Sequence, residues 1–299
     1  MTDPSHQRRQ RLIGIALMCG AVACFSGLDT TAKFLNTRME TLEIVWARYT
    51  GAFVLAFVVS NPLSRPDLLR TTRPGLQIVR SALLLASTVL GFFALKYLRL
   101  DQTMTILFST PFFVAVLSGP LLGEWVGWRR WTAIGVGFAG VLVVMRPGVG
   151  GIHPAAVLSL IGAVLYSLYN VSTRLLARTD STQTTLFYSN LVGALALLPV
   201  LPAVWTTPTD PIVIGLMVLV GALGSFGHYL LIAAIRLTPP MILSPFIYTQ
   251  LVWSIALGFL VFGDVPDRWT LIGSAIVVSS GLYMLFREQK VAAERAKGS

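Results

Sequence analysis

Long apolar segments alternate with short polar ones along almost the whole chain. Charge, proline or glycine bounds each segment, and none shows the strict alternation of a half-buried β-strand. A helix is the simplest structure that satisfies its own backbone hydrogen bonds inside a bilayer. The pattern therefore predicts ten transmembrane helices, near residues 11–35, 42–60, 76–97, 101–122, 130–146, 154–175, 183–204, 211–235, 240–262 and 269–287.

The composition excludes a soluble domain. Of the 299 residues 55% are hydrophobic and only 12% are charged, about half the usual charged share. The net charge of +10 comes from basic residues in small groups between apolar segments, so nucleic-acid binding is not expected. Cys19 and Cys24 lie in the first apolar segment and make neither a disulfide framework nor a metal site.

The basic residues also predict the orientation. With a cytoplasmic N-terminus, 15 Lys and Arg residues fall on the inner side and 5 on the outer side. Arg8, Arg9 and Arg11 precede the first apolar segment as in a signal peptide, but that segment is long enough to be a retained helix. We expect a multi-pass inner-membrane protein with two cytoplasmic tails, 1–10 and 288–299.

The chain contains an internal repeat with an offset close to 140 residues. Five helices in 11–146 are followed by five in 154–287, and an odd number inverts the second unit in the membrane. Inverted repeats are common in secondary transporters, where substrate binds near the middle of the membrane between the halves. The matching pairs are Ala94-Leu95-Lys96 with Ala234-Ile235-Arg236, Gly123-Glu124 with Gly263-Asp264, and Trp131-Thr132 with Trp269-Thr270.

Together these motifs resemble the drug/metabolite transporter superfamily, in its ten-helix EamA-type branch. The resemblance adds Tyr97 at the end of the third helix and Pro111 within the fourth, although Leu251 stands where the second half would repeat that proline. It implies that helices 1, 3, 4, 6, 8 and 9 surround a central cavity, with helices 5 and 10 at the periphery. It also implies export of small metabolites, often amino acids.

Several charged residues and prolines inside the spans are candidates for gating or coupling: Asp29, Lys33, Arg48, Pro111 and Pro245. Asp29 and Lys33, four residues apart, form an intrahelical ion pair, or else they provide an outer gate or a proton-linked carboxylate. Arg48 either has a structural role or binds the carboxylate of a substrate. Arg80 is close enough to the inner end of its helix to extend to the membrane surface. The prolines predict kinks, which are hinges or static bends.

Polar and aromatic residues also gather near the middle of the membrane. Hydroxyls, amides and rings suit a zwitterionic substrate with an apolar or aromatic side chain, although ordinary packing explains any one of them. His228 is either a titrating group or a neutral, hydrogen-bonded one. The candidate substrate-binding residues are Ser87, Thr88, Thr105, Phe108, Ser109, Tyr166, Tyr169, Asn170, His228, Tyr248 and Gln250.

The leading hypothesis is a secondary transporter that exports small metabolites, most often amino acids, by alternating access. The alternatives are efflux of lipophilic cations, or transport of a vitamin or nucleoside-like metabolite. A membrane-embedded enzyme or scaffold is a third reading, but the sequence has no nucleotide-binding, metal or catalytic motif. We therefore expect no cofactor and no metal. The expected partners are the lipid bilayer and a small-molecule substrate, in a monomer or homodimer.

Overall fold

The computed structural model describes residues 4–60, 70–123, 125, 127–146, 152–177, 179–238 and 240–297. All regular structure within these ranges is helical, which confirms the expected all-α membrane fold. Four residues that bear on the motifs, kinks and orientation lie outside the described residues: Arg65, Glu124, Arg178 and Pro239.

The helices follow the predicted segments closely. They are α1 (Pro4–Leu35), α2 (Thr41–Ser60), α3 (Pro74–Leu95), α4 (Leu100–Leu107), α5 (Thr110–Leu122), α6 (Trp128–Met145), α7 (Pro154–Leu176), α8 (Thr182–Ala196), α9 (Leu201–Val204), α10 (Pro211–Leu237), α11 (Pro240–Leu243), the 3₁₀ helix η2 (Ser244–Tyr248), α12 (Thr249–Phe262) and α13 (Arg268–Lys297). Among the described residues, eight helical segments are long and apolar enough to cross a membrane. Of the other two predicted spans, α6 has two arginines in its first turn, and α8 has 15 residues before a turn leads into α9.

Local sequence explains where several helices begin and end. Proline stands in the first turn of α3, α7 and α10, where the missing N–H costs nothing. Gly123 and Gly263 end α5 and α12 with φ angles of 74° and 69°, a left-handed conformation that glycine adopts without strain. These two glycines are the repeat mates of the Gly-acid motif, so the motif marks the same helix end in both halves.

The fourth and ninth predicted spans are both broken. The fourth divides into α4 and α5 at a turn formed by Phe108 and Ser109. The ninth passes from α11 through η2 into α12 at Tyr248. Pro111 lies in the first turn of α5, just after the first break, and Pro245 lies in the first turn of η2, within the second. Neither proline can donate a backbone hydrogen bond. Their role as hinges stays a prediction.

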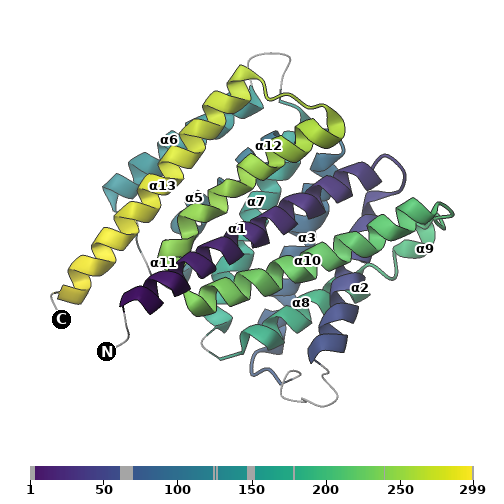
Figure 1. The fold of residues 1–299 in the computed structure, drawn as a ribbon, viewed down its shortest axis with the longest axis horizontal. Coiled ribbons are helices and arrows are strands. Elements are labelled where there is room, and N and C mark those ends of the chain that lie inside the picture. The colour runs from purple at the N-terminus through teal and green to yellow at the C-terminus, as the bar shows by residue number, and fades with distance from the viewer. Residues whose placement is uncertain are drawn as a thin grey trace.

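The helices pack with a twofold repeat pattern. In Figure 1, α6 and α13 lie side by side at one edge of the molecule, the peripheral place expected for helices 5 and 10. Helix α1 packs on α10 and α12, while its counterpart α7 packs on α3 and α5. One hydrogen bond repeats as well: Ser26 Oγ donates to Gln250 O at 3.3 Å, and Ser167 Oγ donates to Thr110 O at 3.1 Å. Exchanging the halves therefore preserves the packing.

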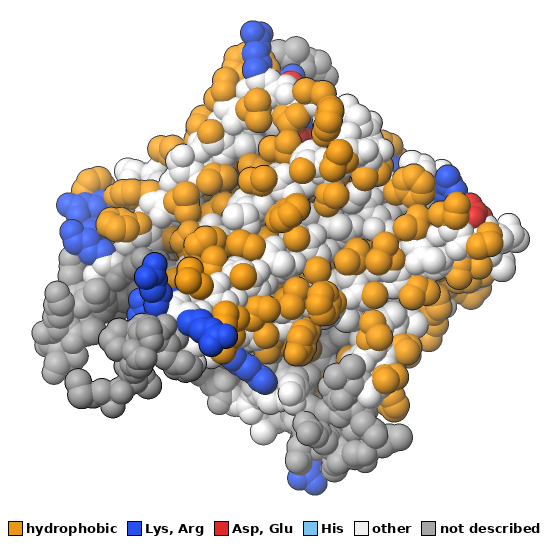
Figure 2. Space-filling model, viewed as in Figure 1, with side chains coloured by type: hydrophobic (Ala, Val, Ile, Leu, Met, Phe, Trp, Pro, Cys, Tyr) orange, Lys and Arg blue, Asp and Glu red, His pale blue; other side chains and the backbone are white. Residues whose placement is uncertain are grey.

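The surface matches a lipid environment. Figure 2 shows hydrophobic side chains across the middle of the visible face, with Lys and Arg side chains near its margins. Large apolar side chains such as Val58, Phe259 and Leu260 are more than half exposed. Both ends of the chain lie at the same end of the bundle (Figure 1). The molecule is a multi-pass membrane protein.

Candidate functional site

A small cavity lies between α2, α3, α7, α8 and α10. Leu84 and Gly224, which line it, stand near the midpoints of α3 and α10, so the cavity is near the middle of the membrane. Its polar lining consists of Arg48, Tyr49, Tyr169, Ser189, Asn190 and His228. Both repeats contribute, as the inverted-repeat argument requires.

Arg48 is held at the cavity wall by a small polar cluster. Its Nη1 donates to Thr88 Oγ1 at 2.9 Å, and its guanidinium lies 4.8 Å from the centre of the Tyr49 ring. Thr88 donates to Leu84 O at 2.9 Å, so the Tyr49 hydroxyl, 2.9 Å from Thr88 Oγ1, acts as the donor there. Thr88 thereby fixes both the arginine and the tyrosine.

Asp29 lies within electrostatic range of Arg48, whereas Lys33 pairs with a different acid. The charge on Arg48 acts on the half-buried Asp29 carboxyl across the interface of α1 and α2. Lys33 Nζ instead donates to Asp264 Oδ2 at 2.9 Å and to Leu98 O at 3.1 Å. In the part of the chain that the structure describes, no ion pair joins Asp29 to Lys33, so the structure does not have the intrahelical pair.

Aromatic rings surround the charged groups. Tyr166 and Tyr169 are stacked in α7 with ring centres 5.4 Å apart, and His228 meets the edge of Phe25 at 5.1 Å. Asn170 donates to Tyr166 O within its own helix at 2.8 Å. The cavity therefore offers ring faces beside an arginine, and Asn170 has a local structural bond.

Arg80 is the clearest difference between sequence and structure. The sequence places it near enough to the inner end of α3 to reach the surface, but it is only 1% exposed. It donates to Tyr169 OH at 2.8 Å and to Ser189 Oγ at 2.8 Å, two residues that line the cavity. No pattern along α3 announces these partners, because they come from α7 and α8 through tertiary packing.

A second group of predicted site residues lies in the helix packing instead. Phe108 and Tyr248 meet edge to face with ring centres 5.0 Å apart in an apolar cluster of α4, α5, α6, α7, α12 and α13. Thr105 Oγ1 lies 2.6 Å from Ser274 Oγ, and Ser109 donates to Ile106 O at 2.6 Å. A substrate role for these four residues stays a prediction.

Two further predicted residues make contacts between helices. Ser87 Oγ donates to Gly162 O at 2.9 Å and so joins α3 to α7. The backbone carbonyl of Gln250 accepts a hydrogen bond from the Ser26 hydroxyl, which joins α12 to α1. Among the described residues there is no group of three or more His, Cys, Asp or Glu side chains that could hold a metal ion.

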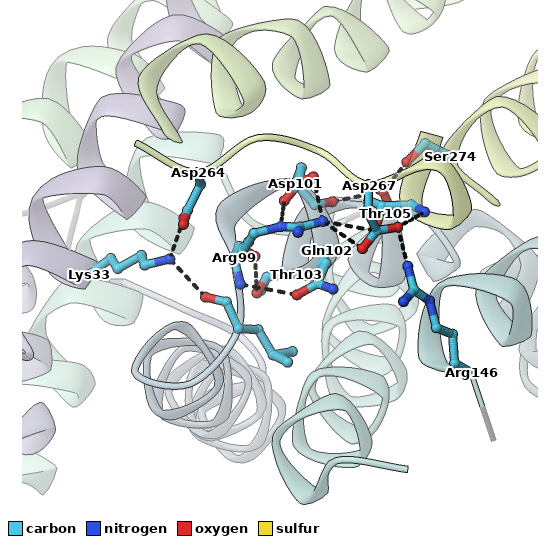
Figure 3. A network of polar contacts seen from close by, with 12 residues as sticks. Lys33, Arg99, Asp101, Gln102, Thr103, Thr105, Arg146, Asp264, Asp267 and Ser274 are labelled. Atoms are coloured by element: carbon cyan, nitrogen blue, oxygen red, sulfur yellow. Dashed lines mark hydrogen bonds and ion pairs between the residues drawn. The ribbon is translucent and has the colours of Figure 1, made fainter. Parts of the chain in front are cut away.

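An ion-pair network joins the two halves at the end of the bundle away from the termini (Figure 3). Lys33 bonds to Asp264, while Arg99 and Arg146 both pair with Asp267. Arg99 and Asp267 are 3.3 Å apart. Each of these pairs connects the first repeat to the second, so the network fastens this end of the molecule.

The carboxylate at the centre of this network is stabilised as an anion. Burial alone would raise the pKa of Asp267, but the Thr270 backbone N–H and the guanidinium groups of Arg146 and Arg99 outweigh it. The pKa of Asp267 therefore lies below its ordinary value of 3.8. The pairing holds at neutral pH.

Comparison with known proteins agrees with this architecture. The model of the EamA-like transporter family matches residues 12–146 and again 153–287. A solved structure titled "Crystal structure of protein" superposes with a TM-score of 0.65 at 17% identity, covering 93% of this chain and 98% of that one. At this identity, the likeness shows a shared fold.

Three relatives carry named transport activities. The S-adenosylmethionine uptake transporter of Rickettsia bellii is 27% identical, over 95% of this chain and 97% of the relative. The riboflavin transporter of Vibrio cholerae is 26% identical, over 93% of this chain and 95% of the relative. The pseudopaline exporter of Pseudomonas aeruginosa is 24% identical, over 89% of this chain and 93% of the relative. This chain therefore belongs to the EamA-like transporter family, and it is a membrane transporter rather than an enzyme.

Proposed function

We propose that this chain carries a zwitterionic metabolite with an aromatic ring system across the inner membrane, and that S-adenosylmethionine is the first candidate substrate. The observation that carries the proposal is the mid-membrane cavity lined by Arg48, with Asp29 in electrostatic range and tyrosine rings alongside.

The chemistry of S-adenosylmethionine suits these groups one by one. Its amino-acid end carries an ammonium and a carboxylate, which match Asp29 and Arg48. Its adenine ring can stack on aromatic side chains, and its sulfonium is favoured near ring faces. Relatives that are 26–27% identical over most of this chain are S-adenosylmethionine uptake transporters.

Export of aromatic or apolar amino acids is the second candidate. A free amino acid presents the same ammonium and carboxylate, so the Asp29–Arg48 arrangement favours it as well. Riboflavin has rings but no ammonium, so it makes no use of Asp29. Competition among these three ligands therefore separates the candidates.

Alternating access between the two repeats supplies the transport step. The cavity lies between the halves, while the network of Lys33, Asp264 and Asp267 fastens one end of the bundle. With both termini cytoplasmic, that fastened end faces outward. Substrate passes when the network opens and the opposite end closes.

Proteoliposomes that contain the purified chain test the proposal. Labelled S-adenosylmethionine is followed in both directions, with unlabelled S-adenosylmethionine, phenylalanine, tryptophan or riboflavin as competitors. We expect protein-dependent movement of the label, blocked by excess unlabelled S-adenosylmethionine and weakened by Asp29→Asn. Absence of movement in either direction contradicts the substrate assignment, and movement of phenylalanine alone selects the second candidate.

A further inference from the structure

The buried Arg80 carries a charge that its hydrogen-bond partners do not neutralise. Its guanidinium donates to the hydroxyls of Tyr169, Ser189 and Thr173 and to the carbonyl of Thr185, at distances of 2.6 to 3.1 Å. All four acceptors are uncharged, and among the described residues no acid forms an ion pair with Arg80. A buried cation without a counterion is costly, so a purely structural link is better made by a neutral side chain.

The bond to Tyr169 sets how that tyrosine can act. A phenol has one proton, and Tyr169 accepts from Arg80 Nη2 at 2.8 Å. The guanidinium also lies 4.4 Å from the centre of the tyrosine ring, which fixes the ring against α3. The hydroxyl proton of Tyr169 is therefore free to be donated to a ligand in the cavity that Tyr169 lines.

Ser189 differs from Tyr169 in this respect. Its hydroxyl accepts from Arg80 at 2.8 Å and donates to Thr185 O at 2.8 Å. Its proton is already used, so Ser189 holds Arg80 in place and offers no donor to the cavity. The buried charge of Arg80 therefore acts on a ligand through the Tyr169 hydroxyl.

Arg48 comes from the first repeat and lines the same cavity as Tyr169, which comes from the second. Its Nη1 bonds to Thr88, another uncharged partner, and it lines the cavity together with Tyr169. One guanidinium group and one hydroxyl polarised by the buried Arg80 thus meet at this cavity, while Asp29 is the acid whose carboxyl Arg48 acts on. Donors with excess positive charge are the arrangement that binds a carboxylate.

We infer that Arg48 and the Tyr169 hydroxyl form a carboxylate subsite in this cavity, and that Arg80 is a positioning residue that holds and polarises Tyr169. The subsite rests on the proposed function only in that the carboxylate belongs to the transported molecule. It binds the acid group of the substrate's amino-acid end, opposite the ammonium that faces Asp29.

Binding to the detergent-purified full chain tests the subsite with two pairs of probes. S-adenosylmethionine is compared with decarboxylated S-adenosylmethionine, and phenylalanine with phenylalaninamide, in the unchanged protein, Tyr169→Phe and Arg80→Gln. Tyr229→Phe is the matched control, because Tyr229 is 64% exposed and stacks on Phe226 outside the cavity lining. The ratio of the two affinities in each pair does not depend on how much protein is folded.

We expect the unchanged protein to favour the acid of at least one pair by tenfold or more, because a hydrogen bond to a charged group contributes about that factor. Tyr169→Phe lowers this preference about tenfold and leaves the affinity for the analogue without the carboxylate unchanged. Arg80→Gln has the same effect, and Tyr229→Phe has none. If Arg80→Gln does not fold, Tyr169→Phe decides the question.

Other results separate this inference from the proposed function. Equal binding of S-adenosylmethionine and its decarboxylated analogue overturns the subsite and leaves the proposed function standing. A preference for phenylalanine over its amide that depends on Tyr169, without binding of S-adenosylmethionine, supports the subsite and overturns that substrate. Equal losses for acid and analogue in Tyr169→Phe, or binding of neither acid, overturn the subsite.

Discussion

Arg48 on α2 lines the cavity, and Asp29 on α1 lies within electrostatic range of Arg48. Charged groups are expensive inside a membrane, which is why the sequence alone singles them out. The same rule identifies Tyr169 and His228, which also line the cavity. The partners of Asp29 and Lys33 could not be predicted, because the competing acid, Asp264, is 231 residues from Lys33 along the chain.

Replacement of Asp29 by asparagine tests the negative charge. We expect Asp29→Asn to weaken S-adenosylmethionine binding about tenfold, since a charge-assisted bond to the ammonium is lost. Riboflavin binding, if present, is unchanged because riboflavin has no ammonium. Glu40→Gln makes the same chemical change at an exposed position and serves as the control. Equal affinities in Asp29→Asn and the unchanged protein would refute the assignment.

The residues that sequence reasoning missed have their partners on other helices. Tyr49 and Asn190 line the cavity, but nothing in the segments around them marks the side that faces it. Arg80 was misplaced because its distance from the helix end was the only cue along the chain. Phe108 and Tyr248 are separated by the repeat offset of 140 residues, and the structure brings them into contact with each other.

Helices α2 and α10 cross at two glycines. A Cβ atom added to Gly221 would lie 2.8 Å from Gly51 Cα, which is a backbone atom that cannot rotate away. Small residues allow this close approach, as in many membrane helix pairs. The crossing places Gly224, one turn further along α10, at the cavity wall. Packing at this crossing therefore determines the shape of the site.

Gly221→Ala forces α2 and α10 apart. We expect it to destabilise the folded protein by about 1 to 3 kcal/mol, the usual cost of overpacking a well-packed contact. Thermal unfolding in detergent measures the change. Gly215→Ala is the control, because a Cβ atom at Gly215 on the same helix meets nothing within 4 Å. Identical melting temperatures for the two variants would show that the crossing tolerates a side chain.

Element boundaries were mostly predictable, and the exceptions have clear causes. Charge and proline locate most helix ends, and Pro111 and Pro245 locate the two breaks. Segment α8 is shorter than the predicted span because the chain turns after Ala196 and resumes as α9. Hydropathy alone does not distinguish such a turn from continuous helix, since both are apolar.

In the whole molecule, ion pairs join the two repeats at one end of the bundle. Beyond the network of Figure 3, Arg38 pairs with Asp210 at 2.9 Å across the same two halves. The repeat offset predicts the inverted halves and their equivalent packing. It could not predict these pairs, because Asp264 and Asp267 follow α12 in a loop whose course depends on the docked halves.

Opening of this end is expected to depend on Lys33. We predict that Lys33→Gln increases, severalfold, the rate at which a membrane-impermeant thiol reagent modifies Asn190→Cys in a Cys19→Ser/Cys24→Ser background. The loss of its bond to Asp264 favours the open state. Arg268→Gln is the control, since Arg268 is exposed and lies over Trp269. Unchanged labelling in Lys33→Gln would mean that this pair does not close the cavity.

Low pH is expected to weaken the ion pairs at the same end of the bundle, because protonation removes the charge of Asp267. Because its pKa is lower in the folded protein, its contribution to stability is complete above about pH 5 and is lost as the pH falls below 3.8. We expect Asp267→Asn to lower the melting temperature by a few degrees at pH 7. The difference from the unchanged protein should shrink as the pH falls below 3.8, because protonation removes the charge of Asp267. A difference independent of pH would contradict the ion-pair explanation.

The most direct test of the central claim is a structure of the purified protein with bound S-adenosylmethionine. The account predicts ligand density in the cavity between α2, α7 and α10, with the carboxylate at Arg48 and Tyr169 and the ammonium toward Asp29. Density beside Phe108 and Tyr248 instead, or an empty cavity at saturating ligand, would contradict it.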